Sequence, residues 1–160
     1  MAADKTNVMR ILDKAKVSYC THSYSADDGL IDAVHSAQKM GLPESQVYKT
    51  LVTRGTGRDF FVFVIPAAAE LDLKAAARAV GQKSVAMIHV AELLGITGYI
   101  RGGCSPIGMK KQFVTVFDES CTGLETMVVS AGKIGHMVEL APNDLIALVR
   151  GKTAAITMPQ

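Results

Sequence analysis

Two short glycine-rich segments in the second half of the chain constrain its fold and its chemistry most. They read Gly-Gly-Cys-Ser-Pro-Ile-Gly at 102–108 and Ser-Ala-Gly-Lys-Ile-Gly at 130–135, and each follows an apolar run. Because glycine has no Cβ, a ligand can approach the main chain closely and successive N–H groups can point into one cavity. The simpler interpretation is two tight turns between strands, since glycine and proline are first of all turn residues. Both interpretations stay open for either segment taken alone.

The composition predicts one globular unit over residues 1–160. The chain is 49% hydrophobic and has no Pro/Gly/Ser-rich or like-charge stretch that would act as a linker. Its 17 basic and 15 acidic residues nearly balance, which excludes a broad basic surface for non-specific nucleic-acid binding. A local basic rim is still expected if the two segments converge, because Arg101, Lys110 and Lys111 flank the first segment and Lys133 lies inside the second.

The cysteines and histidines give no metal signature. Neither residue type shows the short spacings of metal ligands, so we expect reduced thiols in apolar sites, no metal and no cofactor. The chain starts Met-Ala-Ala-Asp-Lys, without the order of a secretion signal, and no apolar run approaches the ~20 residues of a membrane helix. We therefore expect a cytoplasmic protein with no membrane partner.

Apolar spacing and turn residues predict interleaved helices and strands. Helices are expected at about 5–16, 31–40, 72–80, 90–94 and 143–149, with an acidic residue, Asp72, in the first turn of the third. Strands are expected at 17–24, 47–53, 60–65, 99–100, 113–117, 126–129 and 136–140, and the second and third form a hairpin through 54–57. The expected fold class is α/β of the mixed α+β kind: a mixed, mostly antiparallel sheet with flanking helices.

Lys49 lies inside an apolar, strand-forming segment, 47–52. Strict alternation puts Lys49 and Leu51 on one face of this strand, and Tyr48 and Thr50 on the other. A lysine in that setting is commonly an edge residue whose ammonium group reaches solvent. If Lys49 instead points into a cavity, it is a compact cation suited to a phosphate or a carboxylate-like group.

The first glycine-rich segment suggests chemistry by backbone amides. The N–H groups of Gly103, Cys104 or Ser105 are placed to stabilise negative charge on a carbonyl oxygen during acyl transfer. Cys104 and Ser105 are also possible nucleophiles, although no histidine lies near them in sequence. In the second segment, the Ser130 hydroxyl and the Gly132 amide suit contact with a ribose or an amino acid, and the spacing does not match an ATP-binding phosphate loop.

Taken in order, five segments resemble the YbaK/EbsC family of aminoacyl-tRNA deacylases, which are relatives of the editing domain inserted in bacterial prolyl-tRNA synthetase. They are Tyr48–Leu51, Leu71–Lys74, Thr97–Gly108, Val129–Lys133 and Val138–Leu140. Each motif alone is weak, but their joint order and spacing are specific. The resemblance covers about residues 5–150.

This resemblance implies a single editing domain that acts in trans on mischarged Cys-tRNA(Pro), and also on Cys-tRNA(Cys). It implies a contact with the tRNA 3′ acceptor end and a complex with prolyl-tRNA synthetase. It also implies that Lys49 anchors the 3′ end and that the loop from Gly102 to Pro106 polarises the ester carbonyl. Ser130 and Gly132 would then contact the terminal adenosine or the aminoacyl group, and Tyr24 would line the pocket.

The implied mechanism needs no protein nucleophile. In this family the thiol of the bound cysteine attacks its own ester carbonyl, so positioning and amide donors suffice. The chain departs from the family pattern at 31–34, at Ile134 in place of an arginine and at Met137 in place of an aspartate. These departures bear on the amino-acid preference and on the tRNA contacts. The alternatives are a deacylase for Ala-tRNA(Pro) or another small amino acid, and a non-catalytic module that binds the tRNA end or the synthetase.

Overall fold

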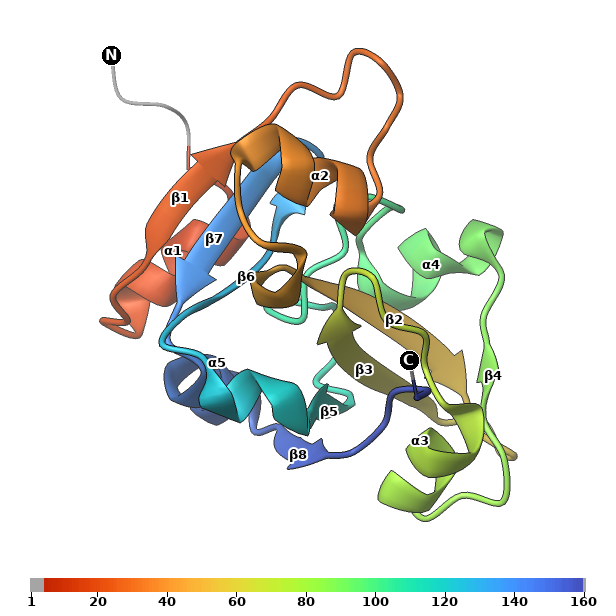
Figure 1. Cartoon of the computed structure of the whole chain (residues 1–160). Coiled ribbons are helices and arrows are strands. Elements are labelled where there is room, and N and C mark those ends of the chain that lie inside the picture. Colours follow the sequence, from red (N-terminus) through yellow and green to blue (C-terminus); the bar gives the residue numbers. More distant parts are fainter. Residues whose placement is uncertain (1–4, 160) are drawn as a thin grey trace.

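The structure is a computed structural model in which residues 5–159 are described, and it contains two β-sheets with helices packed around them (Figure 1). The helices are α1 (Asn7–Lys14), α2 (Ala33–Met40), α3 (Leu73–Ala79), α4 (Val90–Thr97) and α5 (Pro142–Val149). The strands are β1 (Cys20–Ser23), β2 (Tyr48–Arg54), β3 (Phe60–Pro66), β4 (Ala86–Met87), β5 (Val114–Asp118), β6 (Met127–Lys133), β7 (His136–Leu140) and β8 (Lys152–Ala154). Short 3-10 helices occur at Glu44–Gln46 and Glu119–Gly123. The predicted α/β class is confirmed.

The strands divide between a small antiparallel sheet and a larger mixed sheet. The small sheet has the order β1-β7-β6, and the larger one the order β4-β2-β3-β5-β8. The predicted hairpin of β2 and β3 is antiparallel in full register, whereas β5 pairs in parallel with both β3 and β8. An isolated parallel bridge between Val47 and Val128 joins the start of β2 to β6, so the two sheets meet there.

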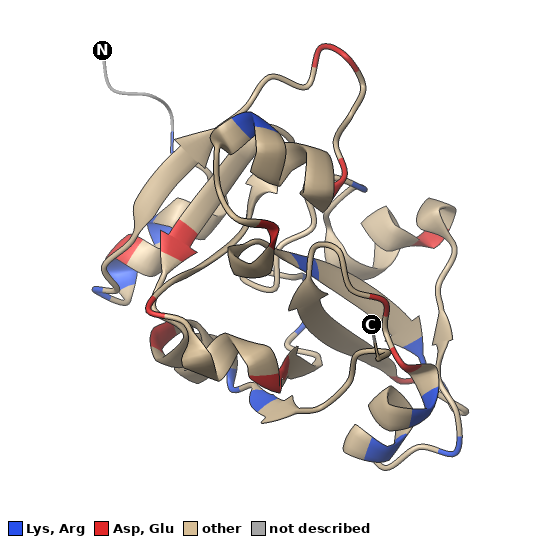
Figure 2. Cartoon of the chain, viewed as in Figure 1, with Lys and Arg blue, Asp and Glu red and all other residues tan. Residues whose placement is uncertain are grey.

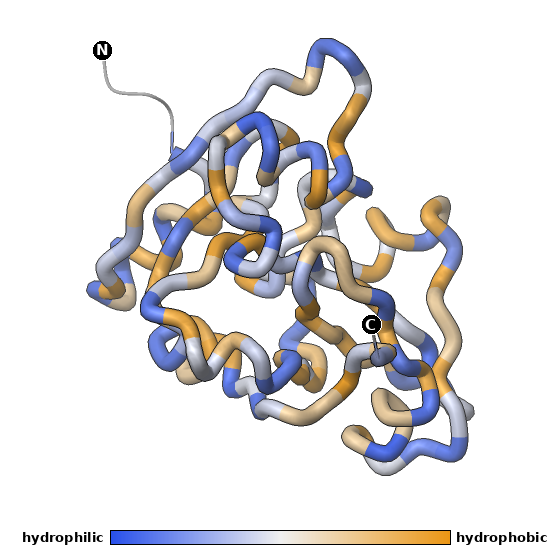
Figure 3. The backbone as a smooth tube through the Cα atoms, viewed as in Figure 1, coloured by the Kyte–Doolittle hydropathy of each residue, from blue (hydrophilic) through white to orange (hydrophobic). Residues whose placement is uncertain are grey.

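Strand β3 is buried on both faces, as its nearly continuous apolar sequence requires. Val62 and Val64 face the core between the two sheets, which also takes Val8 and Leu12 of α1. Phe63 and its neighbours at 61 and 65 face the second core, under α3. In Figure 3 the apolar colours accordingly follow the strands, while the loop between β1 and α2 is polar at its tip.

Helix boundaries follow their caps. The side chains of Thr6 and Asp32 accept hydrogen bonds from Met9 N–H and His35 N–H, and Gly41 ends α2 in the left-handed conformation. Asp72 is the N-cap of α3 and accepts from two amides, so it precedes the first turn in which we predicted it.

Three predictions between residues 90 and 135 need correction. Helix α4 continues through Gly95 to Thr97 and ends at Gly98, whose φ of 87° only glycine adopts readily. Residues 99–100 are not a strand, because Tyr99 N–H donates to the Thr97 hydroxyl and folds the chain back. Most of the second glycine-rich segment is not a loop: β6 continues to Lys133 through a bulge.

The charges are spread over the whole ribbon with both signs mixed, and no broad basic face is visible in Figure 2. This agrees with the formal net charge of +2. Within residues 5–159, no helix has the combined length and apolar character needed to cross a membrane.

Candidate active site

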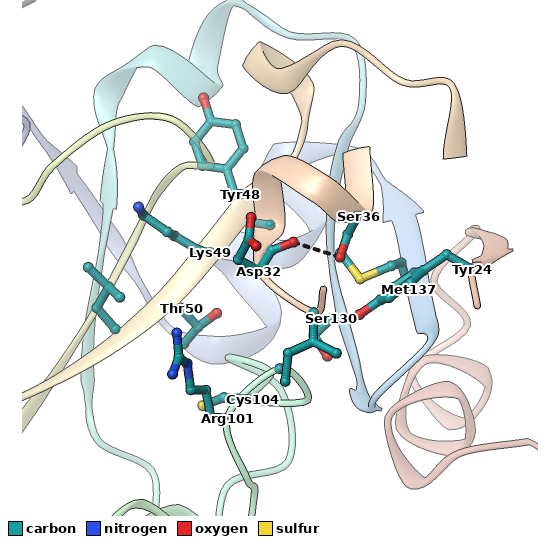
Figure 4. Close-up of a pocket in the computed structure, with 14 residues that line it drawn as sticks. Tyr24, Asp32, Ser36, Tyr48, Lys49, Thr50, Arg101, Cys104, Ser130 and Met137 are labelled. Carbon is teal, nitrogen blue, oxygen red and sulfur yellow. Dashed lines mark hydrogen bonds between the residues drawn. The ribbon is translucent and has the colours of Figure 1, made fainter. Parts of the chain in front are cut away.

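A cavity of about 290 Å³ opens where β2, β6, the start of α2 and the loop after α4 come together (Figure 4). Five of the predicted site residues line it: Tyr24, Lys49, Gly102, Cys104 and Ser130. The two glycine-rich segments do converge here, because a Cβ on Gly103 would lie 3.1 Å from the backbone nitrogen of Ile134. The cavity therefore gathers chemistry that is spread over more than 100 residues of the sequence.

Four predicted residues do not line this cavity: Gly103, Ser105, Pro106 and Gly132. Gly103, Ser105 and Pro106 are buried, and the Ser105 hydroxyl accepts a hydrogen bond from Ile107 N–H at 3.2 Å. Gly132 N–H points to the Ser130 hydroxyl at 3.3 Å, so it is not a free donor for a ligand.

Lys49 is half-buried at the cavity and is not ion-paired with any described residue. Burial lowers the pKa of its ammonium group from the ordinary value, while the charges of Glu70 and Asp32 oppose that shift. Asp32 lies beside Lys49 in Figure 4. Lys49 is thus a poorly solvated cation without a close partner, which is the state expected of a group that binds an anionic or strongly polar ligand.

The strand alternation that we predicted around Lys49 is confirmed for its neighbours Tyr48, Leu51 and Val52. Tyr48 and Val52 belong to the core between the sheets, and Leu51 packs against the core under α3. The Tyr48 hydroxyl lies 2.7 Å from the Ser120 hydroxyl, and it points away from the cavity in Figure 4. Burial raises the pKa of Tyr48 to about 12, so this tyrosine stays neutral and anchors the strand from behind.

Thr50 carries an unexplained polar atom. Its Oγ1 is buried, lacks a hydrogen-bond partner among the described residues, and belongs to a residue that lines the cavity. Buried hydroxyls are almost always paired, because an unmade hydrogen bond costs about 1–3 kcal/mol. An orphan hydroxyl on a residue of the cavity wall is a candidate partner for a ligand.

The backbone amides of the loop at 101–105 differ in their hydrogen bonding. Gly103 N–H donates to Ile100 C=O at 3.0 Å, so the turn consumes this predicted donor. The N–H groups of Gly102, Cys104 and Ser105 make no hydrogen bond to another described residue. Gly102 has a φ of 87°, and a Cβ there would lie 2.7 Å from Ile31 Cδ1. Only glycine fits between the loop and the segment before α2.

Cys104 has the electrostatics of a buried thiol. Burial raises its pKa to about 12, so the neutral thiol dominates at physiological pH. The cavity is not lined by any of the four histidines, so no imidazole there is placed to act as a base. They are His22, His35, His89 and His136. The arrangement favours backbone donors and positioning over attack by a protein nucleophile.

Several cavity residues were missing from the prediction: Ile31, Asp32, Ala33, Ser36, Tyr48, Thr50, Leu51, Arg101 and Met137. Arg101 was expected only as part of a basic rim, and Tyr48 and Thr50 only as neighbours of Lys49. Asp32 could have been found, because an N-cap side chain sits at the open end of its helix. The rim itself is smaller than expected: Arg101 lines this cavity, whereas Lys110 and Lys111 line a different hollow and Lys133 lines neither.

Among residues 5–159, no group of three or more His, Cys, Asp and Glu side chains is placed to hold a metal ion. The polar and charged side chains that line the cavity include Lys49, Arg101 and Asp32.

Comparison with known proteins gives a consistent picture. The sequence profile of the aminoacyl-tRNA editing domain matches residues 30–148. A protein of Enterococcus faecalis with the provisional name Cys-tRNA(Pro)/Cys-tRNA(Cys) deacylase EbsC is 44% identical over 153 residues, covering 96% of this chain and 93% of that protein. A crystal structure described provisionally as a trans-editing enzyme for prolyl tRNA synthetase superposes with a TM-score of 0.81 at 22% identity, covering 98% of this chain and all of that one. The hypothetical protein APE2540 has a TM-score of 0.86 at 19% identity, covering 94% and 99%.

Proposed function

The chain belongs to the family of aminoacyl-tRNA editing domains, and we propose that it is a trans-editing deacylase that removes cysteine from mischarged Cys-tRNA(Pro), and also acts on Cys-tRNA(Cys). The E. faecalis relative bears a name for this activity. Cysteine and proline are similar in size, and a pocket that selects by size discriminates one methylene by only about 1–3 kcal/mol. A second site that clears the error is therefore needed.

One observation supports this reaction most: the cavity combines an unpaired cation and free backbone amides with no activated nucleophile. Lys49 and the amides of Gly102 and Cys104 suit an ester at the end of a tRNA. Its volume of about 290 Å³ is at the low end for small-molecule sites, and it fits an aminoacyl group with part of the terminal ribose.

The substrate then supplies the nucleophile. The cysteine sulfur attacks the ester carbonyl carbon, a C–S bond forms, and the bond from that carbon to the ribose oxygen breaks. The thiol proton ends on the leaving ribose oxygen, so the products are a cyclic thiolactone and free tRNA. In this step the Gly102 and Cys104 amides stabilise the negative charge that develops on the carbonyl oxygen. Lys49 holds the 3′ end, and the pocket brings the sulfur to the carbonyl.

Asp32 is assigned to the α-ammonium group of the aminoacyl ester. It supplies the carboxylate of the cavity lining, and hydrogen bonding from His35 N–H lowers its pKa, which keeps it anionic. Met137, from the adjacent wall, is apolar and offers no second charge. Ser130 and Thr50 also line the cavity, and we assign their hydroxyls to the ribose or the aminoacyl backbone. Tyr24 closes the pocket beside them.

The partners follow from this reaction. The macromolecular substrate is a mischarged tRNA, held by its 3′ acceptor end, in the cytoplasm where tRNAs are charged. A chain of net charge +2 with one 3′-end pocket has little means to read tRNA identity by itself. We therefore include a complex with prolyl-tRNA synthetase in the proposal.

The test is release of amino acid from purified Cys-tRNA(Pro), Ala-tRNA(Pro), Pro-tRNA(Pro) and S-methylcysteinyl-tRNA(Pro). Fast loss of cysteine, with the S-methyl ester stable, is expected because the methyl group blocks the attacking sulfur. Release of alanine at a comparable rate would assign the protein to alanine instead. No release from any of the four, with prolyl-tRNA synthetase added, would overturn the deacylase.

Cys104→Ala tests the absence of a protein nucleophile. The neutral thiol is not needed as an attacking group, so we expect at least about half of the wild-type rate to remain. Loss of all activity in a folded variant, judged by an unchanged thermal midpoint, would show that Cys104 attacks the ester itself.

A further inference from the structure

A second hollow, of about 570 Å³, lies where the starts of β3 and β5 meet α4. We propose that it is the docking groove for the sugar–phosphate backbone of the tRNA acceptor arm, a role that rests on the proposed function. Six residues define this acceptor groove: Arg58, Phe60, Ile96, Lys110, Lys111 and Phe113.

The floor of the acceptor groove is aromatic and apolar but open to solvent. Phe60 and Phe113 meet edge to face with ring centroids 6.0 Å apart, and both rings are only half-buried. Val114 beside them is 51% exposed. Exposed apolar surface of this kind, edged by cations, is typical of sites for RNA backbone and unstacked bases.

The walls are cationic. Arg58 and Lys111 are exposed, and neither is ion-paired with a described residue. Asp59 is the acidic residue of the lining, against three cations. The sequence from 93 to 117 contains Arg101, Lys110 and Lys111 but no Asp or Glu. An anionic partner is therefore favoured here, although the protein as a whole is almost neutral.

One segment of the chain, residues 101–113, contributes to both the active-site cavity and the acceptor groove. Arg101 and Gly102 line the cavity of the active site, and Lys110 to Phe113 line the groove. Lys110 N–H donates to Thr97 C=O at 3.0 Å, and the Tyr99 hydroxyl donates to Ile107 C=O, so this loop is closed upon itself. An acceptor strand whose 3′ end enters the cavity passes along this segment, with its phosphates over the cations.

The experiment measures binding of uncharged tRNA(Pro) at several salt concentrations. In the Arg58→Ala/Lys111→Ala variant we expect affinity to fall about tenfold at low salt and the salt dependence to weaken by about 0.7–0.9 in slope for each lost phosphate contact. Lys74→Ala is the matched control, because it removes an exposed cation of α3 that lines neither the cavity nor the groove. It should bind like the wild type.

Affinity and salt slope of the double variant within twofold of the control would overturn the groove. That result would favour a protein partner as the occupant of this exposed apolar surface. Release of cysteine from 2′(3′)-O-cysteinyl adenosine, which lacks an acceptor arm, should be equal in all three proteins. Failure of the wild type to cleave any aminoacyl ester would overturn the deacylase, but a tRNA affinity that depends on Arg58 and Lys111 would still support the groove.

Discussion

Two half-buried polar clusters draw on neighbouring parts of the same strands, yet their hydrogen bonding is opposite. In the Glu139 cluster, Glu139 of β7 lies 2.6 Å from His22 Nε2 and accepts from the Thr126 hydroxyl at 2.6 Å and from Gln46 Nε2 at 3.3 Å. In the active-site cavity, the Lys49 ammonium and the Thr50 hydroxyl find no such partners.

The difference separates stability from function. The Glu139 cluster ties β1, β6 and β7 to the 3-10 turn that precedes β2, so its satisfied bonds fix the strand that carries Lys49. In the cavity, Lys49 and Thr50 keep polar groups without partners among the described residues, at a cost in folding free energy, which is the usual condition of a ligand site. Substitutions of polar groups in the Glu139 cluster should therefore lower stability and spare activity, whereas substitutions of Lys49 or Thr50 should lower activity and spare stability.

The largest effect on activity is expected from Lys49→Met. Removing the anchoring cation should lower kcat/KM for Cys-tRNA(Pro) by about 100-fold or more. Stability should not fall, because folding lowers the pKa of Lys49 and burial of its charged form therefore costs folding free energy. This cost is present at neutral pH, and it disappears as pH rises toward the pKa of Lys49 in the unfolded chain. Deacylation rates check the loss of activity, and thermal unfolding at neutral pH checks the stability.

Lys74→Met is the control for this substitution, since it removes an exposed charge from α3. A Lys49→Met protein with wild-type turnover would remove Lys49 from the site. A large fall in the thermal midpoint of Lys49→Met, absent from the Lys74→Met control, would show that Lys49 stabilises the fold.

Gly102→Ala should lower both activity and stability. Activity should fall about tenfold or more because the loop amides shift. Its φ of 87° costs an alanine about 1–2 kcal/mol, and the new methyl group would meet Ile31. Gly81→Ala is the matched control, with a φ of 69° and no atom within 4 Å of the added Cβ. It should lose similar stability and no activity. Equal activity in both variants would contradict the role of the loop.

How far the sequence predicts these two regions depends on the range of the interactions. Apolar spacing over 8–15 and 31–40 located α1 and α2, and the turn at 54–57 located the hairpin that carries Lys49. The convergence of the two glycine-rich segments was a condition in the pattern of residues, and only the resemblance implied it, by giving both segments roles at one substrate. The resemblance supplied Tyr24, which lies too far from Lys49 and Ser130 in sequence for any spacing rule to link them.

What was missed depends on tertiary contacts. Strands β4 and β8 have two and three residues, too few to show a period, and they form because an edge of the larger sheet is free to pair. The continuation of β6 through Ser130 to Lys133 depends on pairing with β7 across a bulge, which overrides the turn preference of glycine. Similarly, the hydrogen bond from Gly103 N–H to Ile100 C=O depends on the backbone angles of the turn, which the sequence does not specify.

Glu139→Gln should act mainly on stability. Hydrogen bonds from Thr126 and His22 lower the pKa of Glu139, so its stabilising contribution is present above the unfolded value of about 4.3 and is lost as pH falls through the lower folded value. We expect the variant to lose about 1–2 kcal/mol near neutral pH and the difference to shrink at about pH 3. Urea unfolding at both pH values measures this, and a difference that grows with acidity would contradict the assignment.

The sharpest contrast is expected from two identical substitutions, Thr50→Val and Thr126→Val, of which Thr50→Val should change stability least. The Thr50 hydroxyl is an orphan, so its loss should leave the free energy of unfolding unchanged or raise it by about 1 kcal/mol, while deacylation falls about tenfold. The Thr126 hydroxyl donates to Glu139 and accepts from Gln46, so its loss should cost about 1–2 kcal/mol and leave activity almost intact. Urea unfolding and single-turnover deacylation of both variants give the four values. If Thr50→Val is the less stable protein, the cavity is a structural cluster like that of Glu139, and the division between satisfied and unsatisfied polar groups does not separate stability from function in this fold.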